Sequence, residues 1–241
     1  MKVLDTSTGA QATVTPQGRY PAYVLREPGE DYITDHLLRG GRWEWPLIER
    51  ASLLLAPGDV FVDVGANLGV WSLTLAKLVP GITAHAFEPF QETYYQLCGN
   101  IFLNGLSSAI FAHKIALGSG ASDRSRLFQP EERSFGGVTL VPDQGAQVVE
   151  SGISMRELDT FQLSPAVIKI DVEGYEQRVL DGARETIART RPAIFFEAWD
   201  PELRGEQFRD RRDHLFGAIT RLGYRFEALN REDFLALPRA P

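Results

Sequence analysis

The sequence Val60-Phe61-Val62-Asp63-Val64-Gly65-Ala66-Asn67-Leu68-Gly69 predicts a strand, a glycine turn and the start of a helix. Its first five residues form an apolar run with one Asp, which is typical of a strand buried on both faces of a parallel sheet. Gly65 and Gly69 allow a tight turn with close ligand approach. An apolar stripe over 70–79 continues as a helix that ends at Pro80-Gly81.

The same alternation continues toward the C-terminus. Further strands are expected at 82–87, 110–117, 166–170 and 193–196, and helices at 91–103, 175–189 and 204–222. Strands that alternate with helices of this length predict a parallel sheet covered on both faces. Two short apolar segments, 224–229 and 234–237, flank polar residues and predict a closing hairpin with one antiparallel strand.

The segments outside this alternation predict a cap and an insertion. Residues 31–55 have helix-like apolar spacing in two halves, after an extended lead-in over 1–20. Residues 119–153 carry Gly, Ser, Asp and Pro punctuation, and we expect a β-rich insertion there with short strands near 125–128, 137–141 and 146–149, followed by a short helix over 155–161. With no linker in the chain, we expect one domain over 1–241, with a cap at 1–57 and a core at 58–241.

Composition excludes several classes of protein. The 241 residues carry a net charge of −7, which disfavours nucleic-acid and anionic-membrane partners. Cys98 is the only cysteine, so no intrachain disulfide forms, and its apolar neighbours predict a buried core residue. No apolar run approaches the ~18 residues of a membrane span. Without a signal-peptide pattern at the N-terminus, we expect a cytoplasmic protein, and homo-oligomer formation stays open.

Carboxylates gather where the predicted strands end. Asp63, Glu88, Asp171 and Glu197 close four strands, and Glu173 follows two residues after Asp171. Ligands of an open parallel sheet bind at the carboxyl ends of its strands. A cluster of like charges there indicates a ligand with hydroxyl groups or positive charge.

The glycine turn does not match a dinucleotide site. That site requires G-x-G-x-x-G, whereas Asn67 holds the middle position here and the spacing is one residue shorter. Asp63 just before the turn would repel a pyrophosphate. Glu88, at the end of the second strand, stands where an acid binds ribose hydroxyls. The combination favours a nucleoside with a cationic amino-acid part, which describes S-adenosylmethionine.

With these motifs the chain resembles the FkbM-type S-adenosylmethionine-dependent methyltransferases, which have the Rossmann-like class I methyltransferase fold. The resemblance covers about 31–200 and rests on four motifs: Gly58-Asp59 with 61–69, Phe87-Glu88-Pro89, Ile115-Ala116-Leu117-Gly118, and Ile168-Lys169-Ile170-Asp171-Val172-Glu173-Gly174-Tyr175-Glu176. It implies a seven-stranded sheet in the order 3-2-1-4-5-7-6, with strand 7 antiparallel.

The resemblance also implies a set of cofactor-binding residues. These are Glu44, Asp63, Gly65, Ala66, Asn67, Gly69, Glu88, Pro89, Ala116 and Asp171. Glu88 would bind the ribose, Asp171 would lie beside the methionine end, and Glu44 would cap the cofactor. Glu173 would open the next helix and face the cleft.

Methyl transfer to an alcohol needs in-line positioning and the removal of a proton. The candidate catalytic residues are Glu173 and Asp171, followed by His36 on the cap and Glu197, whereas His85 and His113 lie within strands and are read as structural. We expect O-methylation of a sugar or secondary metabolite, with N-methylation less expected. No metal is expected, although Asp171, Glu173, Glu197 and Asp200 offer the oxygen ligands that Mg²⁺ prefers. The alternatives are an NAD-dependent oxidoreductase and a binding protein without turnover.

Overall fold

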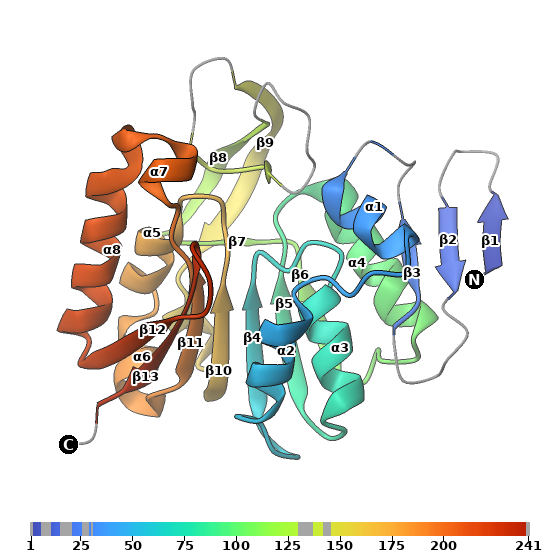
Figure 1. Ribbon diagram of the computed structural model, residues 1–241, viewed down its shortest axis with the longest axis horizontal. Coiled ribbons are helices and arrows are strands. Elements are labelled where there is room, and N and C mark those ends of the chain that lie inside the picture. Colours follow the sequence, from blue (N-terminus) through green and yellow to red (C-terminus); the bar gives the residue numbers. More distant parts are fainter. Residues whose placement is uncertain are drawn as a thin grey trace.

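A seven-stranded sheet organises the chain (Figure 1). The computed structural model describes residues 2–5, 11–14, 21–25, 29, 31–129, 137–141 and 146–239. The strands of the sheet are β4 (Val60–Val64), β5 (Thr83–Phe87), β6 (Ile110–His113), β10 (Pro165–Ile170), β11 (Ala193–Glu197), β12 (Tyr224–Ala228) and β13 (Asp233–Pro238). Their order from one edge is β6-β5-β4-β10-β11-β13-β12. Numbered along the chain this is 3-2-1-4-5-7-6, which confirms the expected topology.

The pairing explains why the first strand is apolar throughout. β4 lies between β5 and β10, parallel to both. Phe61, Val62 and Val64 are buried, with Phe61 and Val62 completely inaccessible. Only β13 runs antiparallel, against β11 on one side and β12 on the other, so the closing hairpin is also confirmed.

Helices cover both faces of the sheet. One core contains residues of α2 (Trp45–Ser52), α3 (Val70–Leu78) and α4 (Gln91–Leu103). The other contains residues of α5 (Glu176–Asp181), α6 (Arg184–Thr190) and α8 (Arg209–Arg221). The expected helix over 175–189 is thus two helices, which separate at Gly182. A Cβ on Gly182 would lie 2.1 Å from the carbonyl oxygen of Gly118, so the backbones meet closely there.

The last long helix also differs from expectation at its start. The predicted helix over 204–222 is divided into α7 (Pro201–Arg204), a 3₁₀ turn (Glu206–Phe208) and α8. Asp200 caps α7, because its side chain accepts a hydrogen bond from the amide of Glu202 at 3.0 Å. This broken segment follows the carboxyl end of β11 and therefore passes beside the ligand edge of the sheet.

Three described segments of the N-terminal region form strands, two of them within the expected extended lead-in over 1–20. β1 (Lys2–Asp5), β2 (Gln11–Val14) and β3 (Tyr23–Leu25) form a small antiparallel sheet beside α4 (Figure 1). The expected cap is present as α1 (Tyr32–Leu38) and α2. α1 begins where Asp31 accepts a hydrogen bond from the amide of Thr34 at 2.8 Å, which is an N-cap interaction.

The insertion forms a third sheet, in the order β7-β9-β8, together with the end of the segment 110–117, which was expected to be one strand and is divided between two sheets. Its strands are β7 (Ala116–Leu117), β8 (Ser122–Gln129) and β9 (Gln147–Arg156). The predicted strands near 125–128 and 146–149 are confirmed and extend further, whereas 137–141 contributes a single bridge from Thr139 to Phe128. The predicted helix over 155–161 is wrong in its first half. Met155 pairs with Ala116 and Ser122 in the sheet, and only Leu158–Phe161 is helical, as a 3₁₀ turn.

Several residues with reactive side chains lie apart from the ligand edge. Cys98 was expected to be a buried core residue, but it is only half-buried. Nδ1 of His85 lies 3.0 Å from Nε2 of His113, with the two rings stacked. Burial and the neighbouring His85 lower the pKa of His113 to about 4, so the pair is neutral at physiological pH. In the described part of the chain, no helix is long and apolar enough to cross a membrane.

Candidate functional site

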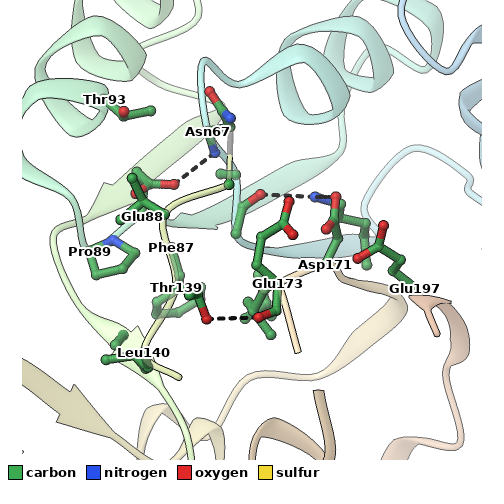
Figure 2. Close-up of a pocket in the computed structure, with 18 of the residues that line it drawn as sticks. Asn67, Phe87, Glu88, Pro89, Thr93, Thr139, Leu140, Asp171, Glu173 and Glu197 are labelled. Carbon is green, nitrogen blue, oxygen red and sulfur yellow. Dashed lines mark hydrogen bonds and ion pairs between the residues drawn. The ribbon is translucent and has the colours of Figure 1, made fainter. Parts of the chain in front are cut away.

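A pocket of about 810 Å³ opens at the carboxyl ends of the parallel strands. Its wall comes from the turn after β4, the end of β5, β7, the segment 137–141, the loop after β10, the segment from β11 into α8, and the α1–α2 cap. Figure 2 shows that Glu88 and Pro89 lie toward one side of it and Asp171, Glu173 and Glu197 toward the other. This volume lies within the range of ~300–1,000 Å³ typical of small-molecule and cofactor sites.

The turn after β4 is shaped by two backbone requirements. Gly65 has a φ of 77°, and a Cβ there would lie 1.9 Å from the carbonyl oxygen of Asp171. Asn67 has a φ of 50°, a left-handed conformation that Asn tolerates better than most residues. Its Oδ1 accepts a hydrogen bond from the next amide, Leu68, at 2.7 Å. Asn67, which stands where a dinucleotide motif has its second Gly, therefore suits the left-handed backbone conformation of this turn.

Glu88 is buried at the end of β5 with its carboxylate fixed by the backbone. Oε2 accepts a hydrogen bond from the amide of Asn67 at 3.0 Å, and Oε1 accepts one from the amide of Phe90 at 2.9 Å (Figure 2 shows the first). Burial raises the pKa of Glu88 to about 7 despite these bonds. Each carboxylate oxygen has further acceptor capacity, so Glu88 can still receive hydroxyl donors from a ligand in the pocket.

Asp63 and Gly69 do not lie on the pocket wall. Asp63 is completely buried behind the turn, where Oδ2 accepts hydrogen bonds from the amide and hydroxyl of Ser72 at 3.2 and 2.7 Å. Gly69 is the N-cap of α3, and a Cβ there would lie 2.6 Å from a methyl group of Leu97. Both residues shape the turn from behind.

Lys169 is a functional side chain that the sequence reading missed. Its ammonium donates to the carbonyl oxygen of Gly65 at 2.9 Å and lies 3.1 Å from Asp171 and 3.9 Å from Asp63. Although burial acts to lower its pKa, the carboxylates of Asp171, Asp63 and Glu44 raise it above the ordinary range. The signal was a lone Lys inside the apolar strand 166–170, a charge that must be paired when buried.

Asp171, Glu173 and Glu197 bring three carboxylates together on the wall. One oxygen from each lies within 4.8 Å of the others. Burial, and then the charge of Asp171, raises the pKa of Glu173 to about 8. The same two causes raise the pKa of Glu197 well above its ordinary value. The cluster therefore favours bound protons, or a ligand with positive charge.

The backbone presents Glu173 to this cluster in a strained conformation. Its φ is 53°, and it lies in a loop ahead of α5. The expectation that Glu173 opens the helix is therefore wrong. Its carbonyl oxygen accepts a hydrogen bond from Thr139 Oγ1 at 2.7 Å (Figure 2), and Glu176 accepts one from the amide of Gly174 at 2.9 Å. Strain held at this level by surrounding bonds is frequent at functional sites.

A divalent cation would find carboxylate oxygens from Asp171, Glu173 and Glu197 in this cluster, but none from Asp200. The carboxylate of Asp200 turns away, toward Arg231 Nε at 2.8 Å and Arg212 Nη1 at 3.3 Å. Glu197 is also engaged, because its Oε2 accepts a hydrogen bond from the indole of Trp199 at 2.9 Å.

The cap contributes Glu44 to the pocket, with a φ of 48°. Its Oε2 accepts a hydrogen bond from the indole of Trp71 at 2.6 Å, which ties the start of α2 to α3. Burial and the charge of Asp171 raise the pKa of Glu44 to about 7. His36 does not reach the wall, because its ring packs on Trp43 with centroids 5.6 Å apart. The structure thus brings Trp43, and not His36, to the pocket.

Most of the expected site residues therefore meet in one pocket. Those on its wall are Glu44, Gly65, Ala66, Asn67, Glu88, Pro89, Ala116, Asp171, Glu173 and Glu197. The sequence reading also missed an aromatic and basic part of the wall, formed by Trp199, Arg204, Phe208 and Arg211. The sequence could have indicated this part of the wall, because aromatic and basic residues follow within fifteen positions of the end of β11.

The comparisons with known proteins show the family of the chain. The family model of the methyltransferase FkbM domain matches residues 63–226, which is more than half of the chain. The 31-O-demethyl-FK506 methyltransferase FkbM of Streptomyces tacrolimicus is 26% identical over 56% of this chain and 64% of its own length. The hexuronic acid methyltransferase AglP of Haloferax volcanii is 27% identical over 52% of this chain and 49% of its own length.

A solved structure supports the fold. Methyltransferase FkbM from Methylobacillus flagellatus KT superimposes with a TM-score of 0.52 at 20% identity, over 76% of this chain and 44% of that one. The match thus spans less than two thirds of these three relatives. The family model covers the glycine turn, Glu88, the acid cluster and the complete strands β5, β6, β10 and β11 of the seven-stranded sheet. The chain belongs to the FkbM methyltransferase family.

Proposed function

We propose that this chain binds S-adenosylmethionine and methylates a hydroxyl group of a small molecule. The observation that carries the proposal is the pairing of two features in one pocket: Glu88 beside the glycine turn at one end, and Glu173 with a pKa of about 8 toward the other. The first suits a ribose, and the second suits proton removal.

The residues of the pocket fit this cofactor. Glu44, Glu88, Glu173 and Glu197 all have raised pKa values, because burial disfavours their charged forms and a nearby aspartate adds repulsion, Asp63 for Glu88 and Asp171 for the other three. A sulfonium cation in the pocket would reverse part of that penalty. The open acceptor capacity of Glu88 suits a pair of ribose hydroxyls. A dinucleotide would instead bring a pyrophosphate into this acidic setting.

S-adenosylmethionine, when bound, supplies a methyl group already activated by its sulfonium. The protein must then hold the acceptor in line and exclude water. We assign proton removal from the acceptor hydroxyl to Glu173, with Asp171 as the neighbour that raises its pKa. Lys169 fixes Asp171, so that carboxylate is better suited to positioning than to proton transfer. A general base contributes ~10²–10⁴-fold to such reactions.

The names of two relatives support a small hydroxylated acceptor. One is described as a methyltransferase of 31-O-demethyl-FK506 and another as a hexuronic acid methyltransferase. A sugar or a secondary metabolite is therefore the proposed acceptor class, with transfer to oxygen preferred over nitrogen.

Two measurements test the proposal. Calorimetry should show binding of S-adenosylhomocysteine, and a thermal-shift comparison with NAD should show stabilisation by the former. Stabilisation by NAD alone would favour the oxidoreductase alternative. A tritiated-methyl assay against a metabolite extract should then give labelled product. Cofactor binding without any labelled product would favour a binding protein without turnover.

A further inference from the structure

The pocket wall carries three cationic side chains: Lys169, Arg204 and Arg211. Lys169 is held by Asp171 and the carbonyl oxygen of Gly65. Arg204 is held by Glu232, with Nε and Nη2 donating to the two carboxylate oxygens at 3.1 Å each. Within the described ranges Arg211 has neither a hydrogen bond nor an ion pair, and its Nη1 is buried without a partner.

Arg211 is nevertheless fixed in place. Its guanidinium lies 5.6 Å from the ring centre of Trp199 and 5.3 Å from that of Phe208. A Cβ on Gly174 would lie 2.3 Å from Nη1, so the group packs directly against the residue that follows Glu173. The indole of Trp199 is itself oriented by its hydrogen bond to Glu197. Stacking of this kind orders a guanidinium without using its N–H donors.

An ordered cation with unused donors is costly unless a ligand completes it. A buried donor without a partner has lost its hydrogen bonds to water, and a bound acceptor group would restore them. The neighbouring arginines show the usual solution: Arg209 pairs with Glu206 at 2.7 Å, and Arg212 with Asp200 at 3.3 Å. Arg211 alone of these neighbours faces the pocket, so a ligand bound there can supply the partner that it lacks.

We propose, on the basis of the proposed function, that the acceptor carries a carboxylate which Arg211 binds while an apolar face of the acceptor packs on Trp199. The planar fork of a guanidinium matches a carboxylate with two parallel hydrogen bonds. Because Arg211 packs on the residue next to Glu173, one small molecule can place its anion at Arg211 and its hydroxyl near Glu173. The substrate class is a hydroxy acid, such as an acidic sugar or an aromatic hydroxy acid.

The test compares matched acids and amides on the protein saturated with S-adenosylhomocysteine. The probes are glucuronic acid, quinic acid and salicylic acid, each beside its carboxamide, scored by thermal shift and, with tritiated S-adenosylmethionine, by methyl transfer. We expect at least one acid to bind or react roughly 10- to 100-fold better than its amide, as for other hydrogen bonds to a charged group. Arg211→Met, which keeps the aliphatic packing on Trp199, should remove that preference, and Arg211→Lys should restore part of it.

Controls separate this inference from the proposed function. Arg209→Gln, an exposed neighbour outside the pocket wall, should retain the preference for acids. Each variant must bind S-adenosylhomocysteine as the parent does, which shows that the fold is intact. Equal use of acid and amide, a preference for acids that survives Arg211→Met, or no response to any acid would overturn the carboxylate site. Failure of the parent protein to bind S-adenosylhomocysteine would overturn the proposed function instead.

Discussion

The backbone amide of Asn67 donates a hydrogen bond of 3.0 Å to Oε2 of Glu88, joining the turn after β4 to the end of β5 (Figure 2). Asn67 itself has a left-handed backbone conformation in this turn. Glu88 is held by that hydrogen bond in one orientation with acceptor capacity directed to the pocket. This hydrogen bond therefore fixes the glycine turn and Glu88 relative to each other.

Substitution of Glu88 should therefore weaken cofactor binding more than it weakens the fold. We expect Glu88→Ala to lower the affinity for S-adenosylhomocysteine by at least about tenfold, because two hydroxyl partners on a charged acceptor are lost. Calorimetry measures this directly. Glu227→Ala, at an exposed surface pair with Arg50, is the control and should bind normally. Unchanged affinity in Glu88→Ala would remove this residue from the cofactor site.

Asp63 should behave in the opposite way. Its carboxylate lies behind the turn and helps to neutralise Lys169. Asp63→Ala leaves a buried cation with one fewer partner, and we expect a loss of about 3 kcal/mol in the free energy of unfolding. Denaturant titration measures this, with the exposed Asp123→Ala as control. A variant of normal stability that no longer binds the cofactor would instead indicate direct contact with Asp63.

Two glycines with similar backbone angles separate strain from crowding. Gly58 has a φ of 95° and nothing within 4 Å of an added Cβ, whereas Gly65 has a φ of 77° and the Asp171 carbonyl in the way. We expect Gly58→Ala to cost about 1 kcal/mol, as the left-handed conformation alone requires. Gly65→Ala should cost clearly more and should abolish binding of S-adenosylhomocysteine. Equal stability losses in the two variants would show that the turn can move away from Asp171.

The pH dependence of methyl transfer should report Glu173. A base must be deprotonated, so kcat/KM should rise with pH and level off above about 8, the raised pKa of Glu173. Glu173→Gln should lower kcat by ~10²–10⁴-fold with cofactor affinity nearly unchanged. The residual activity of this variant should lose the ascending limb. A variant that keeps both its rate and its pH profile would exclude Glu173 as the base.

Stability of the ligand-free protein should fall as pH rises from about 6.5 to 8. In that window Glu44, Glu88 and Glu173 hold protons in the folded state, with pKa values of about 7, 7 and 8, that the unfolded chain, with a value near 4.5, has released. The folded state therefore binds more protons, and its stability decreases with pH. The histidine pair, whose pKa values are lowered by burial, acts in the opposite direction, but this effect declines as pH rises above the ordinary value of 6.5.

S-adenosylmethionine should flatten this dependence more than S-adenosylhomocysteine does, because only the former carries the sulfonium charge. Denaturant titrations at three pH values, with and without each ligand, measure the difference. Identical slopes with both ligands would mean that the acid cluster does not sense the sulfonium.

The sequence by itself determined the order of the helices and strands and the positions of the carboxylates at the strand ends. The central strands β4, β10 and β11 were visible because burial on both faces requires a continuous apolar run. The acids after β5, β10 and β11 were visible because they end such runs. Lys169 carried a signal of the same kind, a charge within an apolar strand.

Only the tertiary structure decided which of these side chains face the pocket. Asp63 and Asp171 both lie near Lys169, yet one is enclosed behind the turn and the other lies on the wall. Glu173 and Asn67 reach the pocket through left-handed backbone conformations, which spacing along the chain does not reveal. The free guanidinium of Arg211 depends on which neighbours pair with one another, and that is a property of packing between distant segments.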